Sequence, residues 1–545
     1  MGRCVAQGLL PAEPCPAFTI EVPADRSHGD LAANVAMISA RAFRLAPRKI
    51  AEAITSNLEL SGTMASRAEV AGPGFINFFL APQWYSAVLE AVLSEGPSYG
   101  SCDLGRGSRV MVEFVSANPT GPMHMGNARG GALGDCLASL LEKAGYAVTR
   151  EFYINDAGNQ IDKFALSLEA RYLQLFRGEE AIPFPEDGYH GEDITTRARE
   201  FAALRGDTFV DAEPAARREA LVEYALPRNV EKLCSDLEKY RIRYDVWFKE
   251  SQLHNDGELS ETIRILKDGG FTYEKEGALW YAATNFGADK DEVLIRANGN
   301  PTYFAADIAY HRNKFLVRGF DRVINVWGAD HHGHVARLKG AMNAIGIDGS
   351  RLDIVLMQLV RLTRNGEIVR MSKRTGKAIS LDDLLEDVPV DAARFFFNLR
   401  EANSHLEFDL DLAVEQSAKN PVYYVQYAHA RIWSILKNLM AEGIMPRKCT
   451  GEEFTLLTAP EERELIMHLA LLPQTIAEAA KTYDPARLTR YVIELATNFH
   501  KFYNTQRVKG EEEPLMQARL NLCICVRDVI KNVLDMLKIT APERM

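Results

Sequence analysis

The chain has 545 residues, a length that exceeds one hydrophobic core and predicts roughly three or four domains. Its 47% hydrophobic and 25% charged residues are typical of a soluble globular protein, and no apolar run is long enough to span a membrane. The net charge of −11 argues against a nucleic-acid partner without excluding one, because local basic patches can bind RNA on an acidic protein.

Residues 1–18 lack the basic start and apolar stretch of a secretory signal, so we expect a cytoplasmic protein without a membrane partner. The eight cysteines form no CxxC pair and no zinc-finger spacing with histidine. We therefore expect reduced thiols.

Residues 1–100 are predicted to form a small α/β domain. Residues 18–22 and 75–80 have strand-like patterns, and residues 30–60 have helical spacing. A polar, glycine-rich linker is expected at 96–107.

Residues 105–385 are predicted to form a Rossmann-like, doubly wound α/β domain. The apolar stretch 109–115 is typical of a strand buried in a parallel sheet, and a helix and a strand follow it in a βαβ unit. The charged helical segment 160–240 is interpreted as an insertion, because prolines and a glycine interrupt its pattern. The α/β pattern then resumes at 279–282, 292–296, 321–327 and 352–356.

The remaining segment, 386–545, is predicted to be an all-α domain. Its composition turns helical from about residue 413. Apolar residues recur at helical spacing near 465–476 and again near 522–534.

The loop 116–127 follows the first strand of the doubly wound domain, where folds of this kind bind ligands. Gly121 and Gly126 allow a ligand to approach the backbone, and His124 can donate to a phosphate oxygen beside the start of a helix. The glycine spacing matches neither the dinucleotide motif nor the Walker loop. Taken alone, the loop favours a turn that carries a capping histidine over a ligand site.

Two short motifs carry a resemblance to a known family. The string HMGN at 124–127 resembles the HIGH signature of class I aminoacyl-tRNA synthetases, and RMSKR at 370–374 resembles their KMSKS signature. The wider strings at 113–122 and 369–376 resemble the arginine-specific family in its bacterial form. Further similar strings occur across almost the whole chain, at 21–32, 72–77, 153–160, 245–248, 420–431, 499–503 and 541–545.

The chain departs from the two signatures at two positions. Asn127 replaces the second histidine of HIGH, and asparagine can donate a hydrogen bond but carries no charge. Arg370 replaces the first lysine of KMSKS and keeps the positive charge in a forked form. The lysine that the family directs at the phosphates, Lys373, is present.

The resemblance implies ATP-dependent ligation of L-arginine to tRNA(Arg) through an arginyl-adenylate, with release of AMP and pyrophosphate. Such a reaction needs alignment and charge stabilisation more than covalent chemistry. We expect catalytic roles for His124, Asn127, Arg370 and Lys373, and further ATP contacts from Gly121, Gly126, Met371 and Ser372. Magnesium is expected to accompany ATP, without a predicted protein ligand.

Tyr303 and Asp307 are four residues apart, so they share one face of a helix, and the family's guanidinium-binding pair maps onto them. Without the resemblance, they could equally be a core ring and a helix cap. The same comparison assigns the guanidinium to Glu113 and the α-amino group to Asn118. It also implies arginine contacts for Ser116 and His331.

The sequence DHHGH at 330–334 leaves a metal site open as a minor alternative, although its spacing repeats no standard zinc pattern. The family's N-terminal module is implied to touch the tRNA elbow, and its helical domain to read the anticodon. Contacts with tRNA are expected from Tyr423, Tyr427, Phe502 and Met545.

We expect a monomer. Three other readings remain open: a class I synthetase of another specificity, a small-molecule nucleotidyltransferase that shares the loop, and an inactive relative that only binds RNA.

Overall fold

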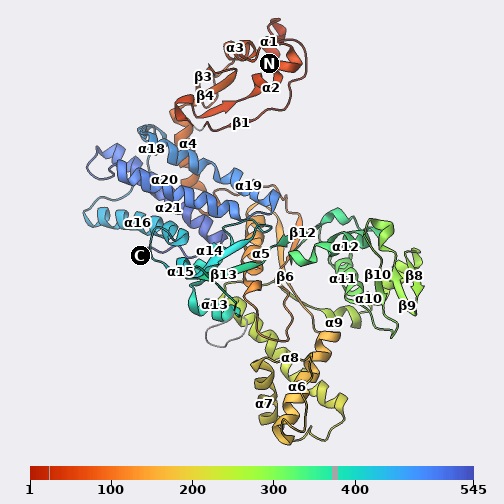
Figure 1. The fold of residues 1–545 in the computed structure, drawn as a ribbon. Helices are drawn as coiled ribbons and strands as arrows, with labels where there is room; N and C mark the ends of the chain where they lie inside the picture. The colour runs from red at the N-terminus through yellow and green to blue at the C-terminus, as the bar shows by residue number, and fades with distance from the viewer. Residues whose placement is uncertain (24, 371–378) are drawn as a thin grey trace.

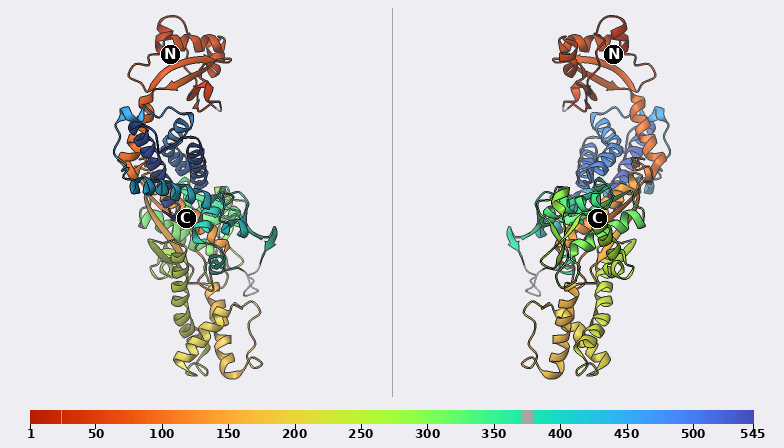
Figure 2. Two further views of the ribbon diagram at one scale, coloured as in Figure 1. Left: turned by 90° about the vertical axis from the view of Figure 1, so that its left-hand side faces the viewer. Right: turned by 90° about the vertical axis from the view of Figure 1, so that its right-hand side faces the viewer.

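The computed structural model describes residues 1–23, 25–370 and 379–545. The molecule is elongated (Figures 1 and 2). The N-terminal module lies at one end, the helical segment 159–239 projects at the other, and the five-stranded parallel sheet lies between them. Within the described residues, none of the helices has the length and apolar character needed to cross a membrane.

The N-terminal module is an antiparallel sheet covered by helices, as the sequence predicts. Its strand order is β1-β2-β4-β3, and its small core includes Ile50, Ile54 and Ile76. The strands are β1 (Ile20–Glu21), β2 (Leu31–Ala33), β3 (Ala65–Ala71) and β4 (Phe75–Leu80), and the helices are α1 (Gly2–Ala6), α2 (Val35–Phe43) and α3 (Pro47–Ser56).

Helix α4 (Pro82–Glu95) connects this module to the rest of the chain but does not belong to it. Its apolar residues Tyr85, Leu89 and Val92 are buried in the core of the C-terminal helices. The module therefore ends near residue 81 rather than near residue 100, because the apolar face of α4 is buried against the helical domain.

The doubly wound domain is built on a five-stranded parallel sheet of order β12-β11-β5-β6-β7. The chain passes from β5 outward to β7, then returns to β11 and β12, so the direction reverses between β5 and β11. Ligands of doubly wound folds bind at the carboxyl ends of the strands at such a switch point. The strands are β5 (Arg109–Glu113), β6 (Ala147–Ile154), β7 (Val246–Lys249), β11 (Arg322–Gly328) and β12 (Leu352–Met357), and α5 (Gly126–Lys143) joins β5 to β6.

Two strand-like stretches that the sequence suggests for this sheet lie elsewhere. The strands β9 (Ala278–Tyr281) and β10 (Glu292–Ile295) form a separate antiparallel sheet with β8 (Thr272–Lys275). The connections within this trio are too short for a parallel crossover, which needs a dozen or more residues. Beside it lie α9 (Glu250–Asn255), α10 (Glu258–Asp268), α11 (Tyr303–Arg312), a π-helical turn at Asn313–Val317 and α12 (His332–Ala344).

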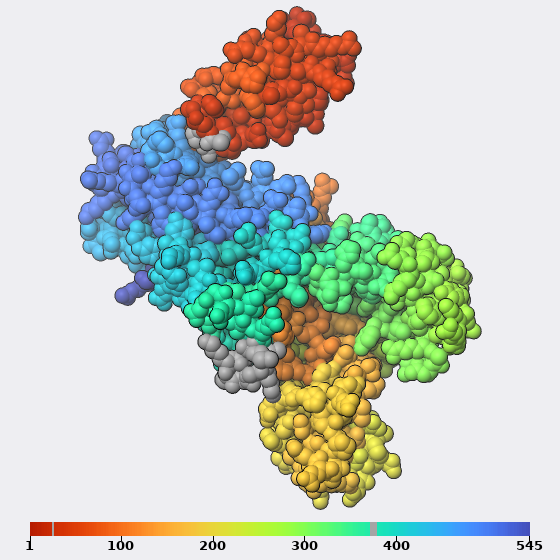
Figure 3. Space-filling model, viewed as in Figure 1, coloured from red at the N-terminus to blue at the C-terminus, as the bar shows by residue number. Residues whose placement is uncertain are grey.

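The insertion consists of α6 (Asn159–Arg177), α7 (Glu192–Arg205) and α8 (Pro214–Lys239). It has a core of its own, in which Phe164, Tyr172 and Phe201 are buried. Figure 3 shows it as the yellow end of the molecule.

A further three-stranded sheet links the doubly wound domain to the C-terminal helices. It contains β13 (Val360–Arg364), β14 (Glu367–Val369) and β15 (Leu406–Asp409), so the segment 386–545 is not purely α-helical. Strand β15 pairs in parallel with β13. The short helices here are α13 (Leu381–Asp387), α14 (Val390–Phe397) and α15 (Leu410–Val414).

The C-terminal helices share one continuous core with α4 and with the α5 side of the five-stranded parallel sheet. They are α16 (Pro421–Ala441), α17 (Gly451–Phe454), α18 (Pro460–Ala470), α19 (Leu472–Thr482), α20 (Ala486–Thr505) and α21 (Glu513–Met536). All eight cysteines are free thiols, as expected.

Candidate active site

The loop between β5 and α5 begins with a strained backbone. Val115 has φ of 71° and Ser116 has φ of 43°, in the left-handed region that β-branched residues avoid. Such conformations cost about 1–3 kcal/mol each and persist only where neighbours hold them. Here the Ser116 hydroxyl donates to Glu113 at 2.9 Å and accepts from the Tyr153 amide at 3.2 Å.

The end of this loop is joined to the segment that follows the second signature. His124 and Ser380 form an antiparallel bridge. The Met125 amide donates to the Ile379 carbonyl at 2.9 Å, and the Leu381 amide donates to the Met123 carbonyl at 2.8 Å. The first signature and the described residues that follow the second one, far apart in sequence, are thus neighbours in space.

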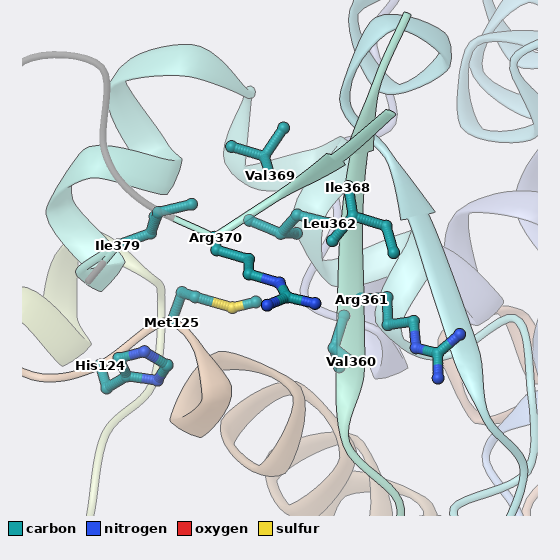
Figure 4. A pocket seen from close by; sticks show the side chains of 9 residues that line it. All are labelled: His124, Met125, Val360, Arg361, Leu362, Ile368, Val369, Arg370 and Ile379. Carbon is teal, nitrogen blue, oxygen red and sulfur yellow. The ribbon is translucent and has the colours of Figure 1, made fainter. Parts of the chain in front are cut away.

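His124 and Arg370 line one cavity of about 390 Å³ (Figure 4). Its walls come from the loop before α5 and from β13 and β14. The remaining lining residues are Met125, Val360, Arg361, Leu362, Ile368, Val369 and Ile379. Met371, Ser372 and Lys373 lie outside the described residues.

The protonation state of His124 follows from its surroundings. Burial lowers its pKa, and its Nδ1 accepts a hydrogen bond from the Gly126 amide at 3.0 Å. The proton of the neutral ring therefore sits on Nε2, which is free to donate to an oxygen in the cavity. A side chain at Gly126 would place a Cβ 3.0 Å from this Nδ1, which explains the glycine.

A second cavity of about 750 Å³ lies at the switch point of the parallel sheet. Its walls include the carboxyl ends of β5, β6, β11 and β12. The structure brings together seven of the residues that the sequence proposes: Glu113, Ser116, Gly126, Asn127, Tyr303, Asp307 and His331. Asn118 is exposed on the loop and is not part of this wall.

Asn127 was expected at the ATP side but lines this second cavity, one turn of backbone from His124 in the first. The two cavities therefore meet at the amino end of α5. A helix amino terminus favours negative charge through its free amides and its dipole.

One wall of the second cavity is acidic. Asp307 on α11 and Glu250 on α9 both line it, and the Nε2 of His334 lies 2.8 Å from Asp307. The pKa of Glu250 is raised to about 7, chiefly by burial and to a smaller extent by the nearby charges of Asp307 and Asp156, against a lowering hydrogen bond from Tyr153. Two carboxylates facing one space form a site for a planar cation.

The sequence interpretation missed Glu250. The signal that could have found it is its place directly after β7, because side chains at the carboxyl ends of parallel strands converge on the ligand. It also missed His334, which was considered only as part of a metal site.

The carboxylate of Glu113 already has partners within the protein. Its Oε2 lies 2.5 Å from the Nζ of Lys314, a fully buried lysine that also lies over the Tyr310 ring. The charge of Glu113 is thus already balanced within the protein, and its other oxygen accepts from Ser116. We assign Glu113 to the support of Ser116 rather than to a guanidinium contact.

The metal alternative at 330–334 gains no support from the structure. His331 lies 3.6 Å from Asp330, whereas His334 turns toward Asp307. In the part of the chain that the structure describes, no three His, Cys, Asp or Glu side chains are arranged to hold a metal ion.

An aromatic pocket of about 380 Å³ lies between α16 and α20 in the helical domain. The rings of Tyr423 and Tyr427 are parallel, with centroids 6.3 Å apart. Burial lowers the pKa of His500 in its wall, and among the described residues the Nε2 of His500 has no hydrogen-bond partner. The other lining residues are Ala418, Tyr424, Arg431 and Asn504.

Two expected tRNA contacts have different outcomes. Met545 is 47% exposed, whereas Phe502 is fully buried among the helices and offers no surface to a partner. The expectation for Phe502 is therefore wrong. Its apolar ring packs in the core of the C-terminal helices. The pattern of aromatic residues in 499–503 does not distinguish a core ring from an exposed one.

Three family models match the chain in succession. They are described as "Arginyl tRNA synthetase N terminal domain" at residues 4–80, "tRNA synthetases class I (R), catalytic domain" at 88–432 and "DALR anticodon binding domain" at 425–545. The match at 4–80 agrees with a module that ends before α4.

Curated relatives match over the full length. The chain is 59% identical to the arginine–tRNA ligase of Acetivibrio thermocellus, covering 100% of this chain and 97% of the relative. It is 58% identical to the arginine–tRNA ligase of Caldanaerobacter subterraneus subsp. tengcongensis, covering 99% and 96%.

The fold agrees with solved structures. The arginyl-tRNA synthetase of Thermus thermophilus superposes with a TM-score of 0.75 at 23% identity, covering 100% of this chain and 98% of that one. A methionyl-tRNA synthetase of Mycobacterium tuberculosis superposes with a TM-score of 0.55 at 13% identity, covering 79% and 91%. These two likenesses concern the fold alone, whereas the domain matches and the full-length identities show that the chain belongs to the arginine–tRNA ligases, a family of class I aminoacyl-tRNA synthetases.

Proposed function

We propose that this chain ligates L-arginine to tRNA(Arg) in two steps at the paired cavities. The observation that carries the proposal is their junction at the amino end of α5, with acidic groups on one side and His124 with Arg370 on the other. The acidic side suits the guanidinium of arginine, and the cationic side suits the phosphates of ATP.

In the first step, an oxygen of the arginine carboxylate attacks the α-phosphorus of ATP, and the bond to pyrophosphate breaks. Negative charge then builds on the leaving pyrophosphate. The Nε2–H of His124 and the guanidinium of Arg370 stabilise that charge, and the amino end of α5 contributes a favourable field. Lys373 is assigned the same role from the sequence signature alone. Gly121 and Gly126 are assigned to the approach of the nucleotide, and Met371 and Ser372 are added from the signature as well.

In the second step, a ribose hydroxyl at the tRNA 3′ end attacks the activated carbonyl carbon, and AMP leaves. Arginine stays in place, so the second cavity must hold it through both steps. Ser116 and Asn127 line the side of this cavity near α5 and His331 lines it after β11, and we assign them to the α-amino and carboxylate end of arginine. The contact of Asn118 with the α-amino group is supported by the family resemblance alone.

Recognition of the side chain falls to Asp307, Glu250 and the hydroxyl of Tyr303. A guanidinium can donate to both carboxylates at once through its fork of N–H groups. The compact ammonium of lysine would leave some of the carboxylate oxygens buried without a donor. Discrimination of this kind reaches large ratios without an editing site.

We assign the aromatic pocket of the helical domain to a base of the tRNA. Stacking on aromatic side chains is worth about 1–3 kcal/mol per base, and the free Nε2 of His500 adds a polar contact that can distinguish bases. The exposed Met545 is assigned to the same surface from the family resemblance.

Magnesium is proposed to enter with the ATP phosphates, since the described residues supply no cluster of metal ligands, and no step here depends on it. We propose that the active unit is a monomer, because one chain supplies the described walls of both cavities. Its expected location is the cytoplasm, where translation consumes charged tRNA.

The proposal is tested by exchange of labelled pyrophosphate into ATP, with each amino acid in turn, with and without tRNA. We expect exchange that depends on arginine and on no other amino acid. Absence of arginine-dependent exchange under both conditions would overturn the proposal and favour an inactive relative that only binds RNA. Exchange with another amino acid would show a different specificity.

A further inference from the structure

The last helix of the insertion, α8, belongs to two hydrophobic cores at once. Leu221 and Ala225 are buried in the core of the insertion, whereas Leu233 and Leu237 are buried in the main core. Pro227 lies inside the helix between the two pairs. A proline inside a helix removes a backbone hydrogen bond and favours a bend, so it marks the border between the two halves.

Directly after this border, Asn229 reaches the loop that carries the first signature. The residue is 6% exposed, and its side-chain Nδ2 donates to the Pro119 carbonyl at 3.0 Å. Its Oδ1 accepts from the Nε of Arg197 on α7 at 3.0 Å. The amide is therefore fixed at both ends, with the insertion on one side and the nucleotide loop on the other.

The same side of α8 also contacts the segment after the second signature. Lys232 and Lys239, at helical spacing from Asn229, both form ion pairs with Asp382 in the first turn of α13. The distance from Lys239 to Asp382 is 3.1 Å. Both lysines also contact the buried Asp236 of α8 itself, which keeps them on this face.

The two contacts converge on one feature. The loop 116–127 begins with a strained backbone and ends at the bridge between His124 and Ser380. Asn229 holds the middle of that loop, and Asp382 lies two residues after Ser380 on the other side of the bridge. The part of α8 from Asn229 to Lys239, which we call the base of α8, thus contacts both segments of the backbone bridge that positions His124.

We propose that the base of α8 is a positioning element for the nucleotide site. The positioning residues are Asn229 on α8 and Asp382 on α13, which pairs with the lysines of α8. Neither residue lines the two cavities, so each acts through the backbone that it holds. The helical insertion is then part of the machinery that aligns His124, rather than an appendage. The proposal rests on the proposed function for its kinetic consequence, but not for its structural one.

The test compares Asn229→Ala and Asp382→Asn with Glu169→Gln. Glu169 pairs with Arg217 inside the insertion at 2.8 Å. Its substitution therefore perturbs the insertion but leaves the contacts of Asn229 and Asp382 in place. Hydrogen exchange of the backbone amides is measured in peptides covering 117–127 and 379–387. We expect faster exchange in both segments in the two test variants and in neither segment in the control.

The second readout is arginine-dependent pyrophosphate exchange in the presence of tRNA. Small misplacements of aligned groups cost up to about 100-fold in rate, so we expect kcat to fall about tenfold or more while KM for arginine stays within about twofold. Glu169→Gln should retain the parental kcat.

Unchanged amide exchange in both loops of the two test variants would overturn the proposal. So would equal loss of kcat in Glu169→Gln, because the effect would then be general destabilisation. If the parental chain lacks arginine-dependent exchange, the proposed function fails, and the hydrogen-exchange comparison still decides the role of α8.

Discussion

The Nζ of Lys314 lies 2.5 Å from the Oε2 of Glu113, which lines the cavity at the switch point of the parallel sheet. The lysine is fully buried and also contacts the Asn325 side-chain oxygen at 3.3 Å. Since Glu113 also accepts from Ser116, the pair holds the start of the strained loop. Both oxygens of Glu113 are therefore engaged within the protein, one by Lys314 and the other by Ser116.

Replacement of Lys314 by methionine leaves a buried carboxylate without its partner. Removal of one member of a buried ion pair costs about 3–5 kcal/mol, and we expect a loss of that order in the free energy of unfolding. Denaturant unfolding followed by tryptophan fluorescence measures it. The double variant with Glu113→Gln should recover part of the loss, and a double variant no more stable than the single one would contradict the assignment.

Arginine binding should depend on the protonation of Glu250. Its pKa is raised to about 7, chiefly by burial, so below that pH the group is mostly neutral and cannot pair with a guanidinium. Affinity for arginine should therefore rise about tenfold from pH 6 to pH 8 and level off above it, because only the ionised form binds. Titration calorimetry across this range measures the effect.

Glu250→Gln provides the control, since it removes the titrating group but keeps the shape. Other titratable groups lie around Glu250: Tyr153, Asp156, Asp307 with its partner His334, and His254, whose Nε2 lies 3.8 Å from the Glu250 carboxylate. A slope that persists unchanged in Glu250→Gln would assign the pH dependence to one of these groups and reject the prediction.

Asp307→Asn should weaken arginine recognition strongly. Hydrogen bonds to charged groups contribute about 1.5–3 kcal/mol, which corresponds to a rise in KM for arginine of about 10- to 150-fold. Tyr303→Phe removes a hydroxyl from a partly exposed ring and should have a smaller effect. Steady-state exchange kinetics compare the two, and a KM for Asp307→Asn equal to the parental value would contradict the site.

The aromatic pocket between α16 and α20 gives a prediction for tRNA. Tyr427→Ala should raise KM for tRNA by about 5- to 150-fold, because stacking of one base is worth about 1–3 kcal/mol. Phe502→Leu is the matched control on the same helices. It is buried, so it should lower the melting temperature and leave KM for tRNA unchanged. The reverse pattern would restore the tRNA contact first expected of Phe502.

The parts of this site that are local in sequence could be predicted from the sequence. The strand, loop and helix around His124 follow from an apolar run, two glycines and helical spacing, and Tyr303 and Asp307 share a helix face. The structure places all three at the cavities.

The remaining features depend on contacts between distant segments. Nothing in the pattern around Lys314 shows that it is buried against Glu113, and nothing near Glu250 shows that α9 turns it toward Asp307. The position of α4 was misjudged for the same reason, because an apolar helix face does not reveal which core it enters. Phe502 shows the limit of aromatic patterns, since burial decides whether a ring packs or binds.

The most direct test of the central claim is the charging of tRNA by the purified chain, with each labelled amino acid in the presence of ATP. We expect acid-precipitable tRNA labelled by arginine alone, with AMP and pyrophosphate released in equal amounts. A chain that charges tRNA with another amino acid, or that binds tRNA but forms no arginyl-tRNA, would contradict the account.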